Sequence, residues 1–461
     1  MTNDEERMTI TDAAPRIRSG ELTPLALLEQ CFARIDIYEP SVHAWAFLDR
    51  ERARREAERL TDEVKRGHYR GPLHGIPVGI KDIIDVFDMP TGCGSKLWAN
   101  SYARRDATCV ERLRQAGAVI VGKTVTTPYA FFDPPPTRNP WNLERTPGGS
   151  SSGSAAAVAC GMVLAALGTQ TGGSVTRPAS YCGVCSIKPT FGRISVDGVL
   201  PFAPSLDHVG VMANCVRDLA LVFEVVAGTD GQSGRAKAIP AATLRIDKRL
   251  SPECEEPPPR FTRLHGLFSD LAEPMMTAAI NELVWKFQLL ISTQARIEEA
   301  VPPAGFAEVG AHHRVIMAVE AATYHGPRFD TRPGDYPAHM RQLIEEGRSI
   351  SAVRYREAKN EQINLEIQMD DPAVWSGHYL TPATTGPAPI AATTGSPVFN
   401  APWSMTGLPT VSFPIGRSDD GMPLAVQLIG TTEFERHLLA DAAWVERIVE
   451  FPRRLPPRPK P

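Results

Sequence analysis

Thr146-Pro-Gly-Gly-Ser-Ser-Ser-Gly-Ser154 runs directly into Ala155-Ala-Ala-Val-Ala-Cys160, and Gly168-Thr-Gln-Thr-Gly-Gly-Ser-Val175 follows soon after. Both loops are rich in glycine, which lacks a Cβ and lets the backbone approach a ligand closely. The apolar segment between them, Ser154 to Leu167, predicts a buried helix. Two such loops around one helix indicate a place where backbone N–H groups and hydroxyls meet a ligand.

The first loop has two other interpretations, a flexible linker and a phosphate-binding loop. A linker usually has a longer run of low complexity. A phosphate loop needs Gly-x-x-x-x-Gly-Lys-Ser/Thr, and no lysine follows the glycines here. This stretch alone therefore leaves a catalytic serine as one of several open interpretations.

The composition limits the classes of function. The chain has 461 residues, of which 43% are hydrophobic, and this predicts a globular protein with a substantial core. The net charge of −4 argues against nucleic acid as a partner, because such proteins usually carry a basic face. The acidic N-terminus is unlike a secretory signal, and no apolar run is long enough to predict a membrane span.

The eight cysteines are scattered, which is typical of reduced thiols and favours a cytoplasmic protein. One pair, Cys182-Gly-Val-Cys185, has the spacing of half a zinc site. No second pair stands at a suitable distance, so we expect no metal and no cofactor.

Helical and strand patterns alternate along the chain, which favours a sheet covered by helices. For example, Asp106 to Ala116 predicts a helix that leads into a strand from Ala118 to Gly122. Gly20 predicts the end of a helix at 8–19, and Thr23 and Pro24 predict the cap and first position of a helix at 24–38. The dense charges at 49–66 predict a helix with a solvated surface. We expect further helices at 215–227, 273–300, 310–323, 351–369 and 433–449, strands at 408–415 and 424–430, and a loop at 325–337.

Lys81 lies in an apolar, β-branched segment from Pro72 to Val86, which predicts a strand. A charged lysine is costly to bury. It either pairs with a carboxylate such as Asp82 or Asp85, or it loses solvation, has a lowered pKa and acts as a base. The residues alone leave both interpretations open.

An aromatic, proline-rich loop at 129–143 leads into the first serine loop, so we expect it to form a wall of the site. Its rings, Tyr129, Phe131, Phe132 and Trp141, favour an apolar or aryl substrate, although they are equally compatible with core packing.

Taken together, these segments resemble the amidase signature family. The resemblance covers the Lys81 strand, both serine loops and the motifs at 139–142, 182–192, 205–210 and 399–409, in the order and spacing of the family. It implies a single-domain α/β/α sandwich over 1–461, with a large mixed central sheet covered by helices on both faces. Residues 230–345 match no common pattern, so we expect a variable helical and loop excursion that shapes the substrate entrance.

The resemblance also implies a Ser-cisSer-Lys catalytic triad, with Ser174 as the nucleophile, Ser150 as the bridging serine and Lys81 as the base. A serine hydroxyl is a weak nucleophile and needs such a positioned base. The oxyanion hole would consist of backbone N–H groups of Thr171, Gly172, Gly173 and Ser174. We place Gly149, next to the bridging serine, among the substrate-binding residues with Tyr129, Phe131 and Phe132.

Two positions depart from the family pattern. Many members have Asp where this chain has Gln170, and Arg where it has Thr176, while Arg177 stands one place later. The loss of both charges is self-consistent if they normally pair, because the loss of one would leave a buried charge unpaired. The departure makes the support of the oxyanion loop less certain.

The resemblance implies a hydrolase that cleaves C–N bonds of amides or carbamates (urethanes), with a small-molecule substrate and water as its partners; some members of the family also cleave esters. The triad does not distinguish this enzyme from the amidase subunit of a tRNA-dependent amidotransferase. A non-catalytic family member is the third alternative. The sequence leaves the oligomeric state open between a monomer and a homodimer.

Overall fold

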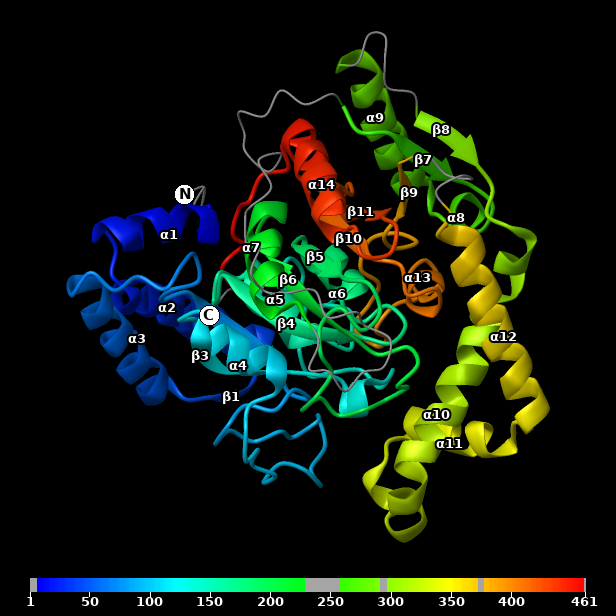
Figure 1. Cartoon of the computed structure of the whole chain (residues 1–461), viewed down its shortest axis with the longest axis horizontal. Coiled ribbons are helices and arrows are strands. Elements are labelled where there is room, and N and C mark those ends of the chain that lie inside the picture. Colours follow the sequence, from blue (N-terminus) through cyan, green and yellow to red (C-terminus); the bar gives the residue numbers. More distant parts are fainter. Residues whose placement is uncertain (1–5, 229–257, 291–296, 372–376, 460–461) are drawn as a thin grey trace.

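A computed structural model describes residues 6–228, 258–290, 297–371 and 377–459. Within these residues, eleven strands form one mixed sheet in the order β1-β3-β2-β4-β6-β5-β10-β11-β9-β7-β8 (Figure 1). The strands are β1 (Trp45–Leu48), β2 (Pro77–Lys81), β3 (Val119–Thr124), β4 (Ala165–Gln170), β5 (Cys185–Lys188), β6 (His208–Ala213), β7 (Phe261–Leu264), β8 (Ile297–Ala300), β9 (His378–Pro382), β10 (Thr410–Arg417) and β11 (Pro423–Ile429).

Helices flank this sheet in Figure 1, as the α/β prediction requires. They are α1 (Ile10–Ser19), α2 (Pro24–Val42), α3 (Arg50–Lys65), α4 (Thr108–Gln115), α5 (Ser152–Ala159), α6 (Thr176–Cys182), α7 (Val216–Val226), α8 (Leu267–Asp270), α9 (Pro274–Leu290), α10 (Val309–Thr331), α11 (Ala338–Ser349), α12 (Ala352–Met369), α13 (Ala401–Met405) and α14 (Glu435–Val449).

The central strands are buried on both faces, which explains why they lack an alternating polar pattern. In β6, Val209 and Val211 join a core cluster that contains side chains of α7 and α14. Met212, which points to the opposite face, joins a second cluster with side chains of α2, α3 and α5. Helices therefore cover both faces of the sheet, and the predicted α/β/α fold is confirmed.

The helix boundaries near the N-terminus follow the predicted signals. Thr23 caps α2 by accepting a hydrogen bond from the Ala26 N–H, and Pro24 occupies the first helical position. Gly20 ends α1 in the left-handed conformation with a φ of 80°. Because capping depends on local chemistry, it was readable from the sequence.

The predicted helix between the serine loops is wrong in extent. The helix α5 ends at Ala159, and the apolar run continues as β4 from Ala165. Gly161, with a φ of 65°, makes the turn that separates them. A fully apolar run has no periodicity that distinguishes a buried helix from a buried strand.

Two further predictions are corrected in the later part of the chain. The expected helix at 273–300 is divided into α9 and the strand β8. The expected loop at 325–337 is helical as far as Thr331, because α10 continues through Pro327. Of the expected variable excursion at 230–345, residues 230–257 and 291–296 lie outside the described residues.

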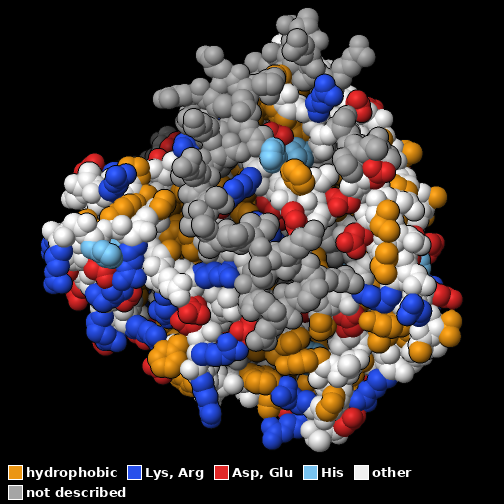
Figure 2. All heavy atoms as spheres, viewed as in Figure 1, with side chains coloured by type: hydrophobic (Ala, Val, Ile, Leu, Met, Phe, Trp, Pro, Cys, Tyr) orange, Lys and Arg blue, Asp and Glu red, His pale blue; other side chains and the backbone are white. Residues whose placement is uncertain are grey.

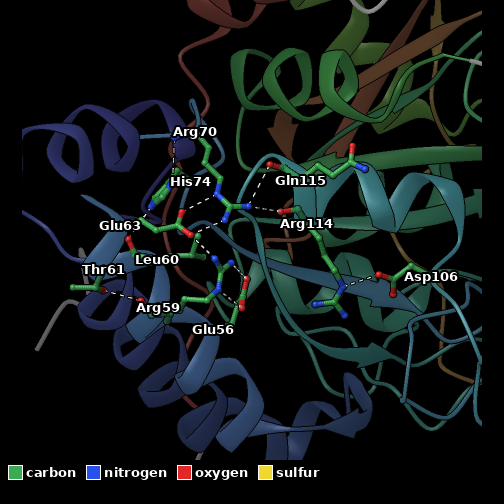
Figure 3. Close-up of polar contacts among 11 residues, drawn as sticks. Glu56, Arg59, Leu60, Thr61, Glu63, Arg70, His74, Asp106, Arg114 and Gln115 are labelled. Atoms are coloured by element: carbon green, nitrogen blue, oxygen red, sulfur yellow. Dashed lines mark hydrogen bonds and ion pairs between the residues drawn. The ribbon is translucent and has the colours of Figure 1, made fainter. Parts of the chain in front are cut away.

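An ion-pair network fixes the segment that leads into β2. Figure 3 shows Arg70 between α3 and α4: its Nη2 lies 2.6 Å from Glu63 Oε1, and its Nη1 donates to the Arg114 carbonyl oxygen at 3.3 Å. His74 Nε2 lies 2.9 Å from the Leu60 carbonyl oxygen. The chain therefore enters β2 from an anchored position.

Charged side chains of both signs lie together on the visible face, as over α3 at the left of Figure 2. On α3, Arg59 pairs with Glu56 at 2.6 Å, and Arg54 pairs with Glu29 of α2 at the same distance. These charges form a solvated surface, as predicted for residues 49–66. None of the helices in the described residues combines the length and apolar character that a membrane crossing needs.

Gly153 provides a test of how tightly the first serine loop is packed. A Cβ at this position would lie 2.1 Å from the Ala44 carbonyl oxygen and 2.4 Å from the Val125 nitrogen. We predict that Gly153→Ala lowers the free energy of unfolding by roughly 3 kcal/mol, because backbone atoms must move. Urea denaturation measures this change.

The matched control is Gly310→Ala in α10, where a Cβ would meet no atom within 4 Å. This substitution should leave the free energy of unfolding unchanged or raise it by up to ~1 kcal/mol. Equal effects at both positions would contradict the packing described for the serine loop.

Candidate active site

Lys81 is the last residue of β2, and its side chain is completely buried. Its Nζ lies 2.7 Å from Ser150 Oγ and 2.7 Å from Thr169 Oγ1. Burial lowers the pKa of the Lys81 amine well below its ordinary range, while the charge of Asp207 acts in the opposite direction. No carboxylate among the described residues forms an ion pair with Lys81, so the neutral amine is favoured.

The two serine loops are joined through their backbones. Ser150 follows a cis peptide bond from Gly149, and the next N–H, that of Ser151, donates to the Ser174 carbonyl oxygen at 3.3 Å. Ser174 lies in the loop between β4 and α6 and is half-buried in a pocket wall. The structure thus brings together Lys81, Ser150 and Ser174, the three residues of the predicted triad.

The other serines of the first loop hold the backbone in place. Ser151 Oγ donates to the Thr169 carbonyl oxygen at 3.3 Å, and Ser152 Oγ donates to the Gly148 carbonyl oxygen at 2.7 Å. Ser154 Oγ donates to the Leu167 carbonyl oxygen at 2.9 Å. All three hydroxyls donate to backbone carbonyl oxygens, so these serines stabilise the loop.

The carbonyl groups of the predicted oxyanion loop are held from outside the loop. His313 Nε2 lies 2.8 Å from the Thr171 carbonyl oxygen, and Ser404 Oγ donates to the Gly172 carbonyl oxygen at 2.9 Å. In a planar trans peptide, the N–H points away from the preceding carbonyl oxygen. The N–H groups of Gly172 and Gly173 are therefore turned away from these two side chains.

Glycine is required at Gly173 by a close approach. A Cβ there would lie 2.7 Å from Asn400 Oδ1, whereas a Cβ at Gly172 would lie 3.5 Å from the nearest atom of His313, an ordinary contact. Close contact therefore disfavours a side chain at Gly173 but not at Gly172.

Gln170 supports the same loop without a charge. Its Oε1 accepts hydrogen bonds from the Val175 N–H at 2.9 Å and the Thr176 N–H at 3.0 Å. Its Nε2 donates to Ser404 Oγ at 3.1 Å. The neutral Gln170 amide therefore supports the oxyanion loop and the start of α6. The resemblance implies a charged Asp at this position in many family members.

The half-buried Ser174 lines a pocket with a volume of about 380 Å³. The predicted oxyanion residues Thr171, Gly172 and Gly173 line the same pocket. Another part of the wall comes from α10, through Val309, Gly310, Ala311, His313, Arg314 and Met317. These residues belong to the segment that matched no common pattern in the sequence.

Two of the four predicted substrate-binding residues line the pocket, and two do not. Phe131 and Phe132 line the pocket, with their ring centroids 4.9 Å apart. Tyr129 is outside the lining: it is fully buried, and its ring stacks on Tyr336 at a centroid distance of 4.7 Å. Gly149 is also outside the lining, and its carbonyl oxygen accepts a hydrogen bond from Arg177.

Trp141 also lies outside the pocket lining. Its Nε1 donates to the Cys182 carbonyl oxygen at 2.8 Å, and the guanidinium carbon of Arg417 lies 3.9 Å from its ring centroid. The aromatic loop therefore contributes two of its four named rings to the pocket wall.

Sequence reasoning missed three groups around the site. Thr169 lies next to Gln170 in the glycine motif, where its hydroxyl was overlooked. Asp207 accepts a hydrogen bond from Thr171 Oγ1 at 2.5 Å and lies in a quoted motif without an assigned role. His313 belongs to α10 and had no signal, because no local pattern connects it with residue 171.

The described residues contain no group of three or more His, Cys, Asp or Glu side chains placed to hold a metal ion. Cys182 and Cys185, which have the spacing of half a zinc site, are free and buried. Burial raises the pKa of both thiols above their ordinary range, which disfavours the thiolate form that binds metals.

Comparison with known proteins identifies the family. The amidase family model matches residues 26–366. The chain is 33% identical to a glutamyl-tRNA(Gln) amidotransferase subunit from Chloroflexus aggregans, with 97% of this chain and 98% of the relative covered. It is 32% identical to a putative amidase, AmiD, from Mycobacterium bovis, with 98% and 96% covered.

A solved structure of native peptide amidase from Stenotrophomonas maltophilia has the same fold. The TM-score is 0.83 at 26% identity, and the comparison covers 98% of this chain and 99% of the other. The chain belongs to the amidase family, and it is a hydrolase of the class that acts on C–N bonds.

Gln170 is a direct test of how the loop is supported. We predict that Gln170→Ala lowers the free energy of unfolding by about 3 kcal/mol, because two buried N–H groups lose their acceptor. Thermal or urea denaturation measures this change.

Ser404→Ala is the comparison variant: it removes the partner of Gln170 Nε2 and of the Gly172 carbonyl oxygen, but it leaves both N–H groups bonded to Gln170 Oε1 and opens a smaller cavity. A smaller effect of Gln170→Ala than of Ser404→Ala would contradict this role of the amide.

Proposed function

We propose that this chain hydrolyses amides or carbamates through an acyl-enzyme on Ser174, with Ser150 as proton relay and Lys81 as base. The observation that carries this proposal is the fully buried Lys81 amine, 2.7 Å from Ser150 Oγ. A neutral amine in this position is able to accept a proton, whereas an ammonium group is not.

In the first half-reaction, Ser174 Oγ attacks the carbonyl carbon while its proton passes to Ser150 Oγ and the Ser150 proton passes to Lys81 Nζ. The negative charge that develops on the carbonyl oxygen is stabilised by backbone N–H groups of the loop at 171–174. The same relay, run in reverse, returns the proton to the leaving nitrogen, and the C–N bond breaks.

In the second half-reaction, water attacks the acyl-enzyme. Its proton follows the same path to Lys81. The relay then returns a proton through Ser150 to Ser174 Oγ as the bond between the acyl carbon and Ser174 Oγ breaks, which releases the acid and the free serine. With a carbamate substrate, the intermediate on Ser174 is the corresponding carbonate or carbamoyl ester, according to which bond breaks. An ester substrate follows the same scheme with an alcohol as the leaving group.

The pocket favours a small substrate with an apolar part. Its volume is about 380 Å³, and its wall includes the rings of Phe131, Phe132, Phe202 and Phe306. Such pockets typically hold small organic molecules. A turnover panel of anilides, aliphatic amides, aryl esters and aryl carbamates therefore identifies the preferred bond, with Ser174→Ala as the inactive control.

Active-site labelling tests the nucleophile and the base. We predict that a fluorophosphonate probe labels the protein once, that Ser174→Ala abolishes labelling, and that Lys81→Ala slows labelling and turnover by about a thousandfold or more. Mass spectrometry locates the label, and circular dichroism checks the fold.

The control is Ser180→Ala, because Ser180 is a buried serine of α6 whose hydroxyl donates to the Thr176 carbonyl oxygen. This variant should retain the label. Wild-type turnover in Lys81→Ala would refute its role as the base.

The lowered pKa of Lys81 predicts the direction of the pH dependence. As the pH falls through this pKa, Nζ becomes protonated and loses its ability to accept a proton, so kcat/KM should fall toward acidic pH. A pH–rate profile with one amide substrate measures this fall. A rate that is flat from about pH 5 to about pH 9 would count against a neutral lysine base.

The second candidate function is that of an amidotransferase subunit. It is favoured by the 33% identity to the Chloroflexus aggregans relative, whose name describes that activity. The purified chain distinguishes the candidates: an independent hydrolase turns over small amides alone, whereas an amidotransferase subunit needs its partner proteins. A non-catalytic family member would show neither turnover nor labelling.

A further inference from the structure

The loop at 171–174 has bonded carbonyl groups and, within the described residues, free N–H groups. The N–H groups of Gly172, Gly173 and Ser174 donate to no acceptor in the described part of the chain, and the whole loop lines the pocket. Free donors beside a nucleophile are the arrangement that stabilises an oxyanion. The four carbonyl oxygens contact, in chain order, His313 Nε2 at 2.8 Å, Ser404 Oγ at 2.9 Å, the Arg177 N–H at 2.9 Å and the Ser151 N–H at 3.3 Å.

His313 is the member of this set that comes from the segment without a common pattern. It lies in α10 and is buried, and its ring forms part of the pocket wall. A carbonyl oxygen accepts but cannot donate, so the contact with Thr171 requires a proton on Nε2. Burial lowers the pKa of the His313 ring, the hydrogen bond to Thr171 acts in the opposite direction, and the charge of Arg314 lowers the pKa further. The neutral ring protonated at Nε2 is therefore favoured at neutral pH.

The helix that carries His313 is anchored to neighbouring elements. Arg314 Nη2 lies 2.6 Å from Glu346 Oε2 of α11. Glu320, two turns further along α10, accepts a hydrogen bond from the Ser205 N–H at 2.8 Å. Side chains on anchored helices hold their partners more precisely than side chains on loops. The His313 ring is therefore well placed to fix a group of the 171–174 loop.

We propose that His313 is a positioning residue for the oxyanion hole: its Nε2–H donates to the Thr171 carbonyl oxygen and thereby keeps the Gly172 N–H available to the substrate. This proposal rests on the proposed function of the Ser174 site. The Thr171 carbonyl group and the Gly172 N–H belong to one planar peptide, in which they point in opposite directions. Rotation of this peptide would withdraw the donor and turn the carbonyl dipole toward the developing negative charge. A hydrogen bond that prevents this rotation acts on the rate of the chemical step.

Two other roles for His313 make different predictions. A ring that only contacts the substrate would change substrate binding and leave the chemical step unaffected. A ring that only fills space would be replaced equally well by any side chain of similar size. The rate of the chemical step and the effect of restoring a donor therefore separate the three roles.

The experiment measures phosphonylation of Ser174 by a fluorophosphonate, in which the phosphonyl oxygen gains negative charge as Ser174 Oγ attacks. The chemical step is measured as kinact and the affinity as KI. We expect His313→Leu to lower kinact by about tenfold to a hundredfold and to leave KI unchanged within about twofold, since complete loss of one oxyanion donor typically costs about a hundredfold or more. The kcat and KM values of the preferred substrate from the turnover panel should divide in the same way.

His313→Gln should restore most of kinact, because its side-chain amide supplies an N–H donor for the Thr171 carbonyl oxygen. His312→Leu is the matched control, since His312 is the neighbouring histidine of α10 and lies outside the pocket lining. This control should match the unmutated protein. His313→Phe removes the donor and keeps a ring, so it serves as the second variant if His313→Leu does not fold.

Unchanged kinact in His313→Leu, equal losses in His313→Gln and His313→Leu, or a change confined to KI would overturn the proposal. NMR of ¹⁵N-histidine-labelled protein tests it without the reaction: the signal lost in His313→Gln should be that of a neutral ring protonated at Nε2. Protonation at Nδ1 alone would overturn the proposal, because such a ring cannot donate to Thr171. An unmutated protein that the probe does not label would contradict the hydrolase assignment itself, so the two failures are distinguishable.

Discussion

The contact between the Lys81 amine and two hydroxyls is the constraint on which the rest of the site depends. Nζ is fully buried and lies 2.7 Å from both Ser150 Oγ and Thr169 Oγ1. Burial without a paired carboxylate favours the neutral amine, and this state of Lys81 decides whether the arrangement works as a proton acceptor. The surrounding fold excludes water from this amine and holds it within hydrogen-bonding distance of Ser150. The serine loops, the sheet and the helices around them all contribute.

The sheet brings the three parts of the site together. The strands β2 and β4 run in parallel, with Ile80 opposite Leu167, so their carboxyl ends lie at the same edge. Lys81 ends β2, and the loop with Ser174 follows β4. The first serine loop links these two parts, because Ser150 Oγ contacts Lys81 Nζ and the Ser151 N–H donates to the Ser174 carbonyl oxygen. Chemistry at the carboxyl ends of neighbouring parallel strands is a general property of such sheets.

Much of this arrangement was predictable because it depends on local signals. The capping residues Thr23 and Gly20, the glycine-rich loops and the Lys81 strand all have patterns that need only neighbouring residues. The division of the apolar run at Gly161 was not predictable, since a buried helix and a buried strand share that composition. The approach of His313 to Thr171 was also unpredictable, because it depends on how α10 packs against α11, α12 and α13, all far from residue 171 in the sequence.

The charge state of Lys81 is the central claim, and a direct titration of its Nζ tests it most closely. Protein with ¹⁵N- and ¹³C-labelled lysine gives an NMR signal for each side chain, and the Lys81→Met variant identifies the signal of Lys81. The account predicts a Lys81 signal that is that of a neutral amine at neutral pH, and that shifts to the ammonium form on acidification. An ammonium signal that persists up to about pH 9 would contradict it.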